Sequence, residues 1–179
     1  MLSEAVRTGR LLLRPVRADD AQALFALETW NVVRWLAPVP WPLAPADVEG
    51  YVARAAEEND AGVSANYTIV CNGAPCGVIA LHPRDGAYSL GYWLGEPYWG
   101  RGLMSEATEA FVDAFFARSG VLHVISGVFA GNAASLRVQE KLGFVVVGDT
   151  LRFSRPHGRP MPYYETVLGR ERHARGLAA

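Results

Sequence analysis

The sequence is poor in several residue types whose abundance marks particular classes of protein. It has 179 residues but only two cysteines, Cys71 and Cys76, and a single lysine, Lys141. The cysteines flank a predicted turn at residues 72–75, which places them on paired strands as buried thiols rather than in a metal knuckle. The four histidines are isolated from one another in the sequence. We therefore expect no metal site and no redox role for the cysteines.

The sequence also lacks an excess of charge of one sign and lacks long apolar runs. The formal net charge is -1, so the chain has no overall basic field and nucleic acid is not expected as a partner. No stretch approaches the ~20 apolar residues of a membrane span, and the first ten residues lack the apolar region of a signal peptide. We therefore expect a cytoplasmic protein with no membrane partner.

What the chain does contain is the composition of a folded protein. Half of its residues are hydrophobic, 11% are aromatic and only 20% are charged, which is far from the composition of disordered segments. A chain of this length can bury well over half of its unfolded surface. No repeat, linker or low-complexity tract interrupts it, so we expect one domain over residues 1–179.

Periodicity and turn signals predict both strands and helices. Residues 72–73 and 85–86 have the Asn-Gly and Asp-Gly pairs of tight hairpins. Asp19 or Asp20 can cap a first helix that continues to Trp30. Strands are expected at residues 10–16, 64–71, 76–82, 88–94, 121–129, 144–154 and 161–168. Further helices are expected at 45–59 and 103–118 and between a cap at Asn132 and a stop at Gly143.

One segment must be irregular. Residues 35–45 contain four prolines and two tryptophans, Trp35 and Trp41. Such a loop either lines a pocket or is pinned over the core by its tryptophans, and the sequence leaves both readings open.

Residues 91–109 have the order strand, glycine-rich loop, helix. A helix start presents unpaired amide N–H groups and the positive end of the helix dipole, which suits an anion. Gly100 and Gly102 leave room for a diphosphate near the amides of residues 100–104, and Arg101 adds a mobile charge. On its own, however, the loop fits a simple turn better than a phosphate site, because it lacks the Lys-Ser/Thr of a P-loop and the spacing of a dinucleotide fingerprint.

Two ordered motifs resemble the GCN5-related N-acetyltransferase (GNAT) superfamily. Residues 91–107, GYWLGEPYWGRGLMSEA, resemble its acetyl-CoA loop, and residues 132–144, NAASLRVQEKLGF, resemble its next signature. Trp99 stands where the superfamily usually has Gln or Arg, and Trp-Gly-x-Gly is usual in the RimJ/RimL-like branch, which acetylates the amino termini of ribosomal proteins. Met104 departs from the usual final Gly or Ala. The resemblance extends from residue 10 to the last strand.

This resemblance implies a fold and a cosubstrate. The implied fold is α+β, a GNAT fold with a central, mostly antiparallel twisted sheet of about seven strands, splayed between strands 4 and 5, with helices on both faces. The implied cosubstrate is acetyl-CoA, with its pantetheine arm in the splay and its pyrophosphate in the loop. The implied binding residues are Leu94, Trp99, Gly100, Arg101, Gly102, Leu103, Met104 and Asn132.

The resemblance supplies only part of the catalytic machinery. It implies that Ser135 protonates the departing CoA thiolate, although this serine could equally satisfy the first turn of its helix. The Tyr acid of other members falls at Gln139, and the Glu that some relatives carry falls at Gly127. Glu165 on the last strand is a candidate base, and strand alternation leaves open whether it faces the site, solvent or a salt bridge. A backbone N–H near Leu94 is expected to polarise the thioester carbonyl.

The acceptor is expected to be a primary amine. The branch favours a protein α-amine, with that of a ribosomal protein as the model, and an aminosugar or a polyamine is the alternative acceptor. A non-catalytic acyl-CoA sensor is the alternative function. We place the amine between the 35–45 loop and the final hairpin, with Glu28, Trp35, Trp41 and Tyr164 as contacts and a cationic occupant. A homodimer is one assembly that the sequence leaves open.

Overall fold

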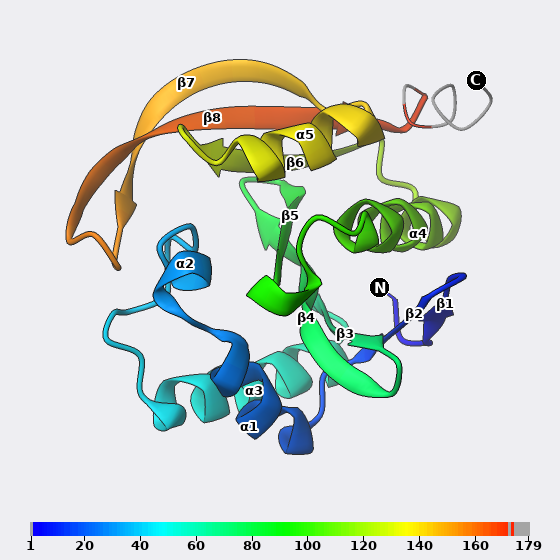
Figure 1. Ribbon diagram of the computed structural model, residues 1–179. Helices are drawn as coiled ribbons and strands as arrows, with labels where there is room; N and C mark the ends of the chain where they lie inside the picture. The colour runs from blue at the N-terminus through cyan, green and yellow to red at the C-terminus, as the bar shows by residue number, and fades with distance from the viewer. Residues whose placement is uncertain (1, 172, 174–179) are drawn as a thin grey trace.

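The computed structural model describes residues 2–171 and 173, which form one sheet with helices on both of its faces (Figure 1). The strands are β1 (Val6–Arg7), β2 (Leu11–Pro15), β3 (Ala65–Cys71), β4 (Ala74–Arg84), β5 (Ala87–Leu94), β6 (His123–Phe129), β7 (Val145–Ser154) and β8 (Arg159–Gly169). The α-helices are α1 (Ala21–Leu27), α2 (Trp30–Val33), α3 (Pro45–Asp60), α4 (Leu103–Arg118) and α5 (Ala133–Leu142), and short 3₁₀ turns cover Ala18–Asp20 and Glu96–Tyr98.

The sheet is mostly antiparallel and divides into two halves. Its strand order is β1-β2-β3-β4-β5-β6-β8-β7, and β5 and β6 are the parallel neighbours. These two strands pair only at Tyr88–Val124 and Ser89–Ile125, so they diverge beyond Ser89 and β6, β8 and β7 curve away from β1 to β5 (Figure 1). The expected splayed GNAT sheet is confirmed. It has eight strands rather than about seven because the two-residue β1 adds to β2.

Local backbone preferences explain why the hairpins formed where the sequence predicted them. Asn72 and Asp85 both have a φ of 51°, and each is followed by a glycine with positive φ. Two left-handed residues in succession make the turn that matches the twist of paired strands. The hairpins therefore fix the register of β3, β4 and β5.

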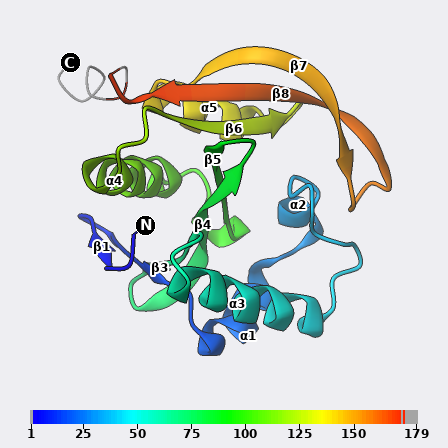
Figure 2. The same cartoon turned by 180° about the vertical axis from the view of Figure 1, so that it is seen from behind.

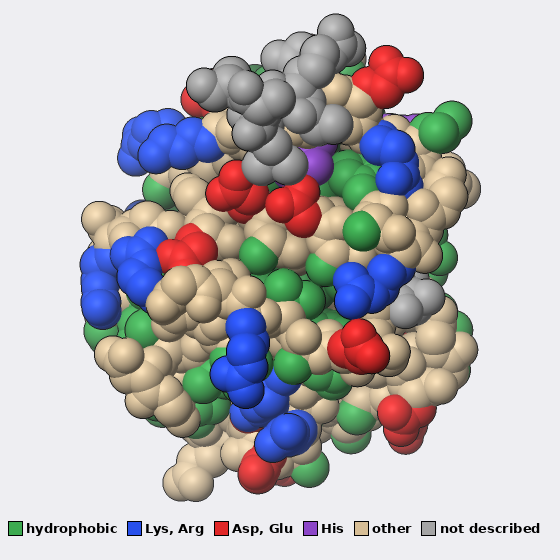
Figure 3. Space-filling model, turned by 90° about the vertical axis from the view of Figure 1, so that its right-hand side faces the viewer, with side chains coloured by type: hydrophobic (Ala, Val, Ile, Leu, Met, Phe, Trp, Pro, Cys, Tyr) green, Lys and Arg blue, Asp and Glu red, His purple; other side chains and the backbone are tan. Residues whose placement is uncertain are grey.

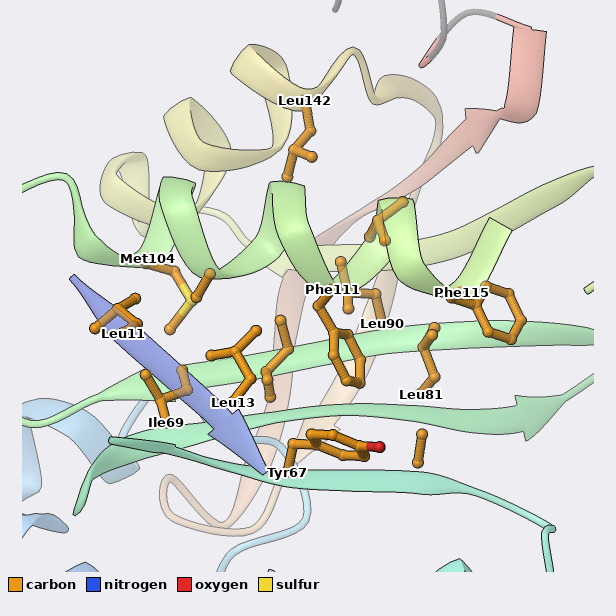
Figure 4. Packing of buried hydrophobic residues seen from close by; sticks show 14 of the residues in the cluster. Leu11, Leu13, Tyr67, Ile69, Leu81, Leu90, Met104, Phe111, Phe115 and Leu142 are labelled. Carbon is orange, nitrogen blue, oxygen red and sulfur yellow. The ribbon is translucent and has the colours of Figure 1, made fainter. Parts of the chain in front are cut away.

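The helices cover opposite faces of the first half of the sheet. Helix α4 lies over one face with α5 beside it, and α1 and α3 cover the other face (Figure 2). The larger core lies under α4, where Phe111 contacts Tyr67 and packs with Leu13, Ile69 and Leu81 (Figure 4). The smaller core joins α1 and α3 to Val78 and Trp93. This packing fixes α4, and with it the loop that precedes it.

The first predicted helix is wrong in two details. It ends at Leu27 and a second, four-residue helix begins at Trp30. Asp20 does not cap it through its side chain; the buried carboxylate instead pairs with Arg14 at 2.6 Å and accepts a hydrogen bond from Thr68 at 2.7 Å. The sequence pattern could not show this, because Thr68 belongs to a different strand.

The surface agrees with the balanced composition. On the face that is turned toward the viewer in Figure 3, acidic and basic side chains are interspersed. No helix among the described residues is long and apolar enough to span a membrane. Cys71 and Cys76 are free, buried thiols, as expected.

Candidate active site

The loop before α4 presents a row of free backbone N–H groups. Gly100 and Gly102 both have a φ of 72°, a conformation that favours glycine. Among the described residues, the amides of residues 100–105 find no hydrogen-bond acceptor, and the first loop-to-helix bond runs from Glu106 N to Gly102 O. These donors lie at the positive end of the 16-residue helix α4, so the loop has the chemistry of an anion site.

The side chains of this loop leave that row open. Leu103 and Met104 are buried in the core beneath α4, so they offer only their backbone to a ligand. Met104 therefore does not obstruct the position where the superfamily usually has a small residue. Arg101 is exposed and does not line the cavity described below.

An ion pair that the sequence did not reveal supports the loop. Arg10, next to β2, pairs with Glu106 at 2.6 Å and donates from Nη1 to the carbonyl of Arg101 at 2.8 Å. The Glu106 carboxylate also accepts from Thr8 Oγ1 and from the backbone N–H of Arg10. Burial opposes ionisation of Glu106, but these hydrogen bonds outweigh it and lower its pKa. The ion pair thus ties the first turn of α4 to the amino-terminal strands.

The splay exposes peptide groups of β5. Gly95 N donates to Cys76 O on the β4 side, so by alternation Tyr92 and Leu94 turn their peptide groups toward the gap. The Leu94 carbonyl is taken by the indole Nε1 of Trp99 at 2.7 Å, which also folds the loop back onto the strand end. The N–H of Leu94 and the peptide group of Tyr92 face the gap without a β6 partner.

A cavity of about 1050 Å³ occupies the splay. Of the site residues expected from sequence, those that line it are Glu28, Trp35, Leu94, Trp99, Gly100, Gly102, Leu103, Met104, Asn132 and Ser135. The structure thus brings together residues from the first helix, the loop before α4 and the start of α5. The volume is at the upper end of the range for ligand pockets, about 300–1,000 Å³.

Besides Arg101, three expected residues lie outside the cavity. Trp41 is 41% exposed and packs against Trp30. The Trp30 ring also contacts His157, so Trp30 connects the irregular loop to the turn of the final hairpin. Tyr164 points to the other face of β8, because neighbouring strand residues alternate, and Tyr163 lines the cavity in its place. Glu165 pairs with Arg84 at 3.7 Å and its side chain is 48% exposed.

Tyr163 also explains the glycine at position 127. Its ring lies directly over Gly127, where a Cβ atom would be 2.3 Å from the nearest ring carbon. A Glu could not occupy this position without displacing the tyrosine. With Tyr163 in this position, the chain has no room for the base that some relatives carry here.

Ser135 has a partner that the sequence did not predict. Asn132 caps α5 by accepting a hydrogen bond from Ser135 N at 3.2 Å, so the serine hydroxyl is not required for the cap. That hydroxyl lies 3.0 Å from the hydroxyl of Tyr92 on β5. Burial raises the pKa of Tyr92 to about 12 although the Ser135 hydrogen bond opposes the rise. The tyrosine therefore remains protonated and can hold the serine in position.

Gln139, where other members have their Tyr acid, is part of a buried network. Its amide nitrogen donates to Ser126 Oγ at 2.9 Å, and its amide oxygen accepts from Thr166 Oγ1 at 2.7 Å. Ser126 in turn donates to Leu90 O at 2.8 Å. The network ties α5 and β8 to β5 close to where the sheet splits, which is a structural role.

Glu28 is the carboxylate of the cavity with an altered ionisation. It ends α1, lines the cavity, and burial raises its pKa to about 7. Tyr51 lies nearby on α3, and its own pKa is raised by burial and by the Glu28 charge. A carboxylate with a pKa near neutrality can accept a proton from an ammonium group at physiological pH.

A divided sheet with a row of unbonded amides at its opening provides a site for an anionic ligand. The family model for the acetyltransferase (GNAT) domain matches residues 10–145, and the chain belongs to this family. The uncharacterized N-acetyltransferase p20 of Bacillus licheniformis is 24% identical to it over 96% of this chain and 99% of that protein.

Two solved structures share the fold. RimL, a ribosomal L7/L12 alpha-N-protein acetyltransferase in complex with coenzyme A, superposes with a TM-score of 0.82 at 21% identity and covers 93% of this chain and 98% of its own. Mycobacterium smegmatis RimJ in complex with a CoA disulfide gives 0.82 at 20% identity over 97% and 91%. At these identities the likeness concerns the fold.

Proposed function

We propose that this protein transfers the acetyl group of acetyl-CoA to a primary amine. The observation that carries the proposal is the row of unbonded N–H groups at residues 100–105, which opens into the same cavity as the unpaired edge of β5. The amides would hold the pyrophosphate, and the peptide group of Tyr92 would pair with the pantetheine arm. Asn132 and Trp99 would border that arm.

The residues around the gap can then divide the chemistry. Glu28 would accept the proton of the ammonium group, so that the free amine attacks the thioester carbonyl. The N–H of Leu94 would polarise that carbonyl and stabilise the charge that develops on its oxygen. Ser135, held by Tyr92, would donate a proton to the departing thiolate. Glu28 replaces Glu165 as our candidate base.

The family branch favours a protein α-amine as the acceptor, with a ribosomal protein as the model substrate. We expect the protein to act in the cytoplasm. A small-molecule amine is the second candidate, because the same fold and cofactor loop serve acceptors of both kinds. A non-catalytic acyl-CoA sensor is the third, but the Ser135–Tyr92 pair and the raised pKa of Glu28 favour an enzyme.

Cosubstrate binding can be tested with a matched pair of glycine variants. Gly100 and Gly62 have φ values of 72° and 66°, and an added Cβ meets no atom within 4 Å at either position. Gly100→Val and Gly62→Val should therefore carry similar backbone strain, but only Gly100 lines the cavity. With CoA at 100 times its dissociation constant, wild type and Gly62→Val should gain about 2.7 kcal/mol, and Gly100→Val should gain much less. Equal thermal shifts in all three proteins would refute the proposed loop site.

Turnover can be tested by thiol release from acetyl-CoA. The amines to compare are amino-terminal peptides, aminosugars and polyamines, each with wild type and with Ser135→Ala. Thiol release that depends on the amine would support the enzyme. CoA binding without release for any amine would favour the sensor.

A further inference from the structure

The cavity is richer in cations than the chain as a whole. Six Arg and Lys side chains border it against two carboxylates, Glu28 and Asp47, whereas the whole chain has 17 basic and 18 acidic residues. Asp47 is engaged at the start of α3, where it accepts from Ala44 N at 2.9 Å. Burial raises the pKa of Glu28 to about 7. Near neutral pH the walls therefore carry a surplus of positive charge.

The sixth cation, Arg155, donates to the carbonyl of Pro38 at 3.0 Å, and the other five lie on two sides of the splay. Arg137 and Lys141 belong to α5, beside α4, where the proposed phosphates of acetyl-CoA would lie. Arg34 follows α2, Arg54 belongs to α3 and Arg152 to β7, so they border the opposite side. The proposed position of the pyrophosphate gives these three arginines no anion.

The guanidinium groups of Arg34 and Arg152 both lie over aromatic rings, and the charge of Arg34 also acts on the Glu96 carboxylate, which is itself hydrogen-bonded by Thr29 and Asn31. The Arg34 guanidinium lies 4.8 Å from the ring centroid of Trp35, and that of Arg152 lies 5.1 Å from that of Tyr163. Neither forms an ion pair with a described carboxylate. The Nε of Arg34 is buried and has no acceptor among the described residues. A buried donor without an acceptor is costly, so a ligand that supplies one is favoured.

We propose that the acceptor carries an anionic group, a carboxylate or a phosphate, beside its primary amine. Arg34 and Arg152 would hold the anion while the amine lies at Glu28. A guanidinium binds either group through two parallel hydrogen bonds. This inference rests on the proposed acetyl transfer and deepens it. It also reverses the expectation of a purely cationic occupant, because polyamines and unmodified aminosugars would meet the surplus positive charge.

The test compares amines that differ only in the anion. One pair is glucosamine and glucosamine 6-phosphate. The other is two tripeptides with amidated carboxyl ends, one beginning Ala-Asn and the other Ala-Asp. Spermidine is the cationic extreme. The anionic member of at least one pair should show a kcat/KM about 10-fold higher or more, as one charge-assisted hydrogen bond allows. The pair that shows the difference identifies phosphate or carboxylate.

Variants connect this preference to the two arginines. Arg34→Gln and Arg152→Gln should each raise KM for the preferred anionic amine about 10-fold and abolish the preference, with KM for acetyl-CoA changed less than about twofold. Arg159→Gln, which removes a charge from the same hairpin outside the cavity, should change neither. Thermal denaturation of each variant reports whether it is folded.

Three results would overturn the inference while leaving acetyl transfer intact. They are equal use of the anionic and neutral amines, a preference for spermidine, and variants that raise KM for acetyl-CoA alone, which would assign the arginines to the cosubstrate. Calorimetric binding of the anionic amines to the CoA-saturated protein gives a readout without turnover. Unchanged binding in both variants would also overturn the inference, whereas absence of CoA binding would overturn the proposed function itself.

Discussion

Replacement of Glu28 by Gln keeps the shape of the side chain and removes its ionisation. The shift of the Glu28 pKa from 4.5 to about 7 means that the folded chain holds this proton more tightly than the unfolded chain. The free energy of unfolding of wild type should therefore fall as pH rises from about 4.5 to about 7 and change little above that on account of this group. At about 1.36 kcal/mol per unit the full shift corresponds to about 3 kcal/mol. Partial exposure of the residue reduces this to about 1–2 kcal/mol between pH 5 and pH 8.

Urea unfolding of wild type and Glu28→Gln at pH 5 and pH 8 measures this difference directly. The variant should gain about 1–2 kcal/mol relative to wild type when the pH changes from 5 to 8. Glu49→Gln, at an exposed position of α3, controls for the loss of a surface charge and should show no such gain. A pH-independent difference between wild type and Glu28→Gln would refute the buried, proton-holding carboxylate.

Kinetics of the same variant test the catalytic role. If Glu28 accepts the amine proton, Glu28→Gln should lower kcat by about 10²-fold or more at pH 8. The acceptor amine itself ionises at a pKa near 8, so its titration contributes to the pH–rate profile of both proteins. The stability measurement reports the ionisation of Glu28 without a contribution from the amine. A Glu28→Gln enzyme with wild-type kcat would show that Glu28 is not the base.

Other predictions follow from the contacts around the loop and α5. Ser135→Ala should lower kcat about 10² to 10⁴-fold with little change in CoA affinity, and Tyr92→Phe should lower kcat less, because it removes only the partner of the serine. Stopped assays with acetyl-CoA and the identified amine measure both effects, and full activity of Ser135→Ala would limit the serine to a structural role. Arg10→Met should weaken CoA binding several-fold because the loop loses its support, while Arg118→Met at the far end of α4 should not weaken it. Calorimetry measures the CoA dissociation constants, and equal values for the two variants would show that the Arg10–Glu106 pair does not support the CoA site. Gln139→Leu should lower the free energy of unfolding, measured in urea, by about 1–3 kcal/mol, because the buried hydroxyls of Ser126 and Thr166 lose their hydrogen-bond partner. An unchanged free energy of unfolding would contradict the buried network.

The sequence by itself determined the elements whose signals are local. Turn pairs fixed the two hairpins, Asn132 and Gly143 fixed the ends of α5, and the apolar stripe of residues 103–118 gave the bounds of α4. Each depends on backbone preferences of a few neighbouring residues, which act in the same way in any fold. The glycine loop also followed from sequence, although only its resemblance to a family distinguished it from a simple turn.

Only the tertiary structure decided which side chains meet in the splay. Tyr92 and Ser135 are 43 residues apart, and Arg10 and Glu106 are 96 apart, so no local pattern could join them. The choice of Tyr163 over Tyr164 depends on strand register, where a shift of one residue reverses the face. The pKa of Glu28 depends on burial by other segments rather than on its neighbours in sequence. Side-chain direction and desolvation are properties of the packed chain, and they are what placed Glu28 in the cavity and left Trp41 and Glu165 outside it.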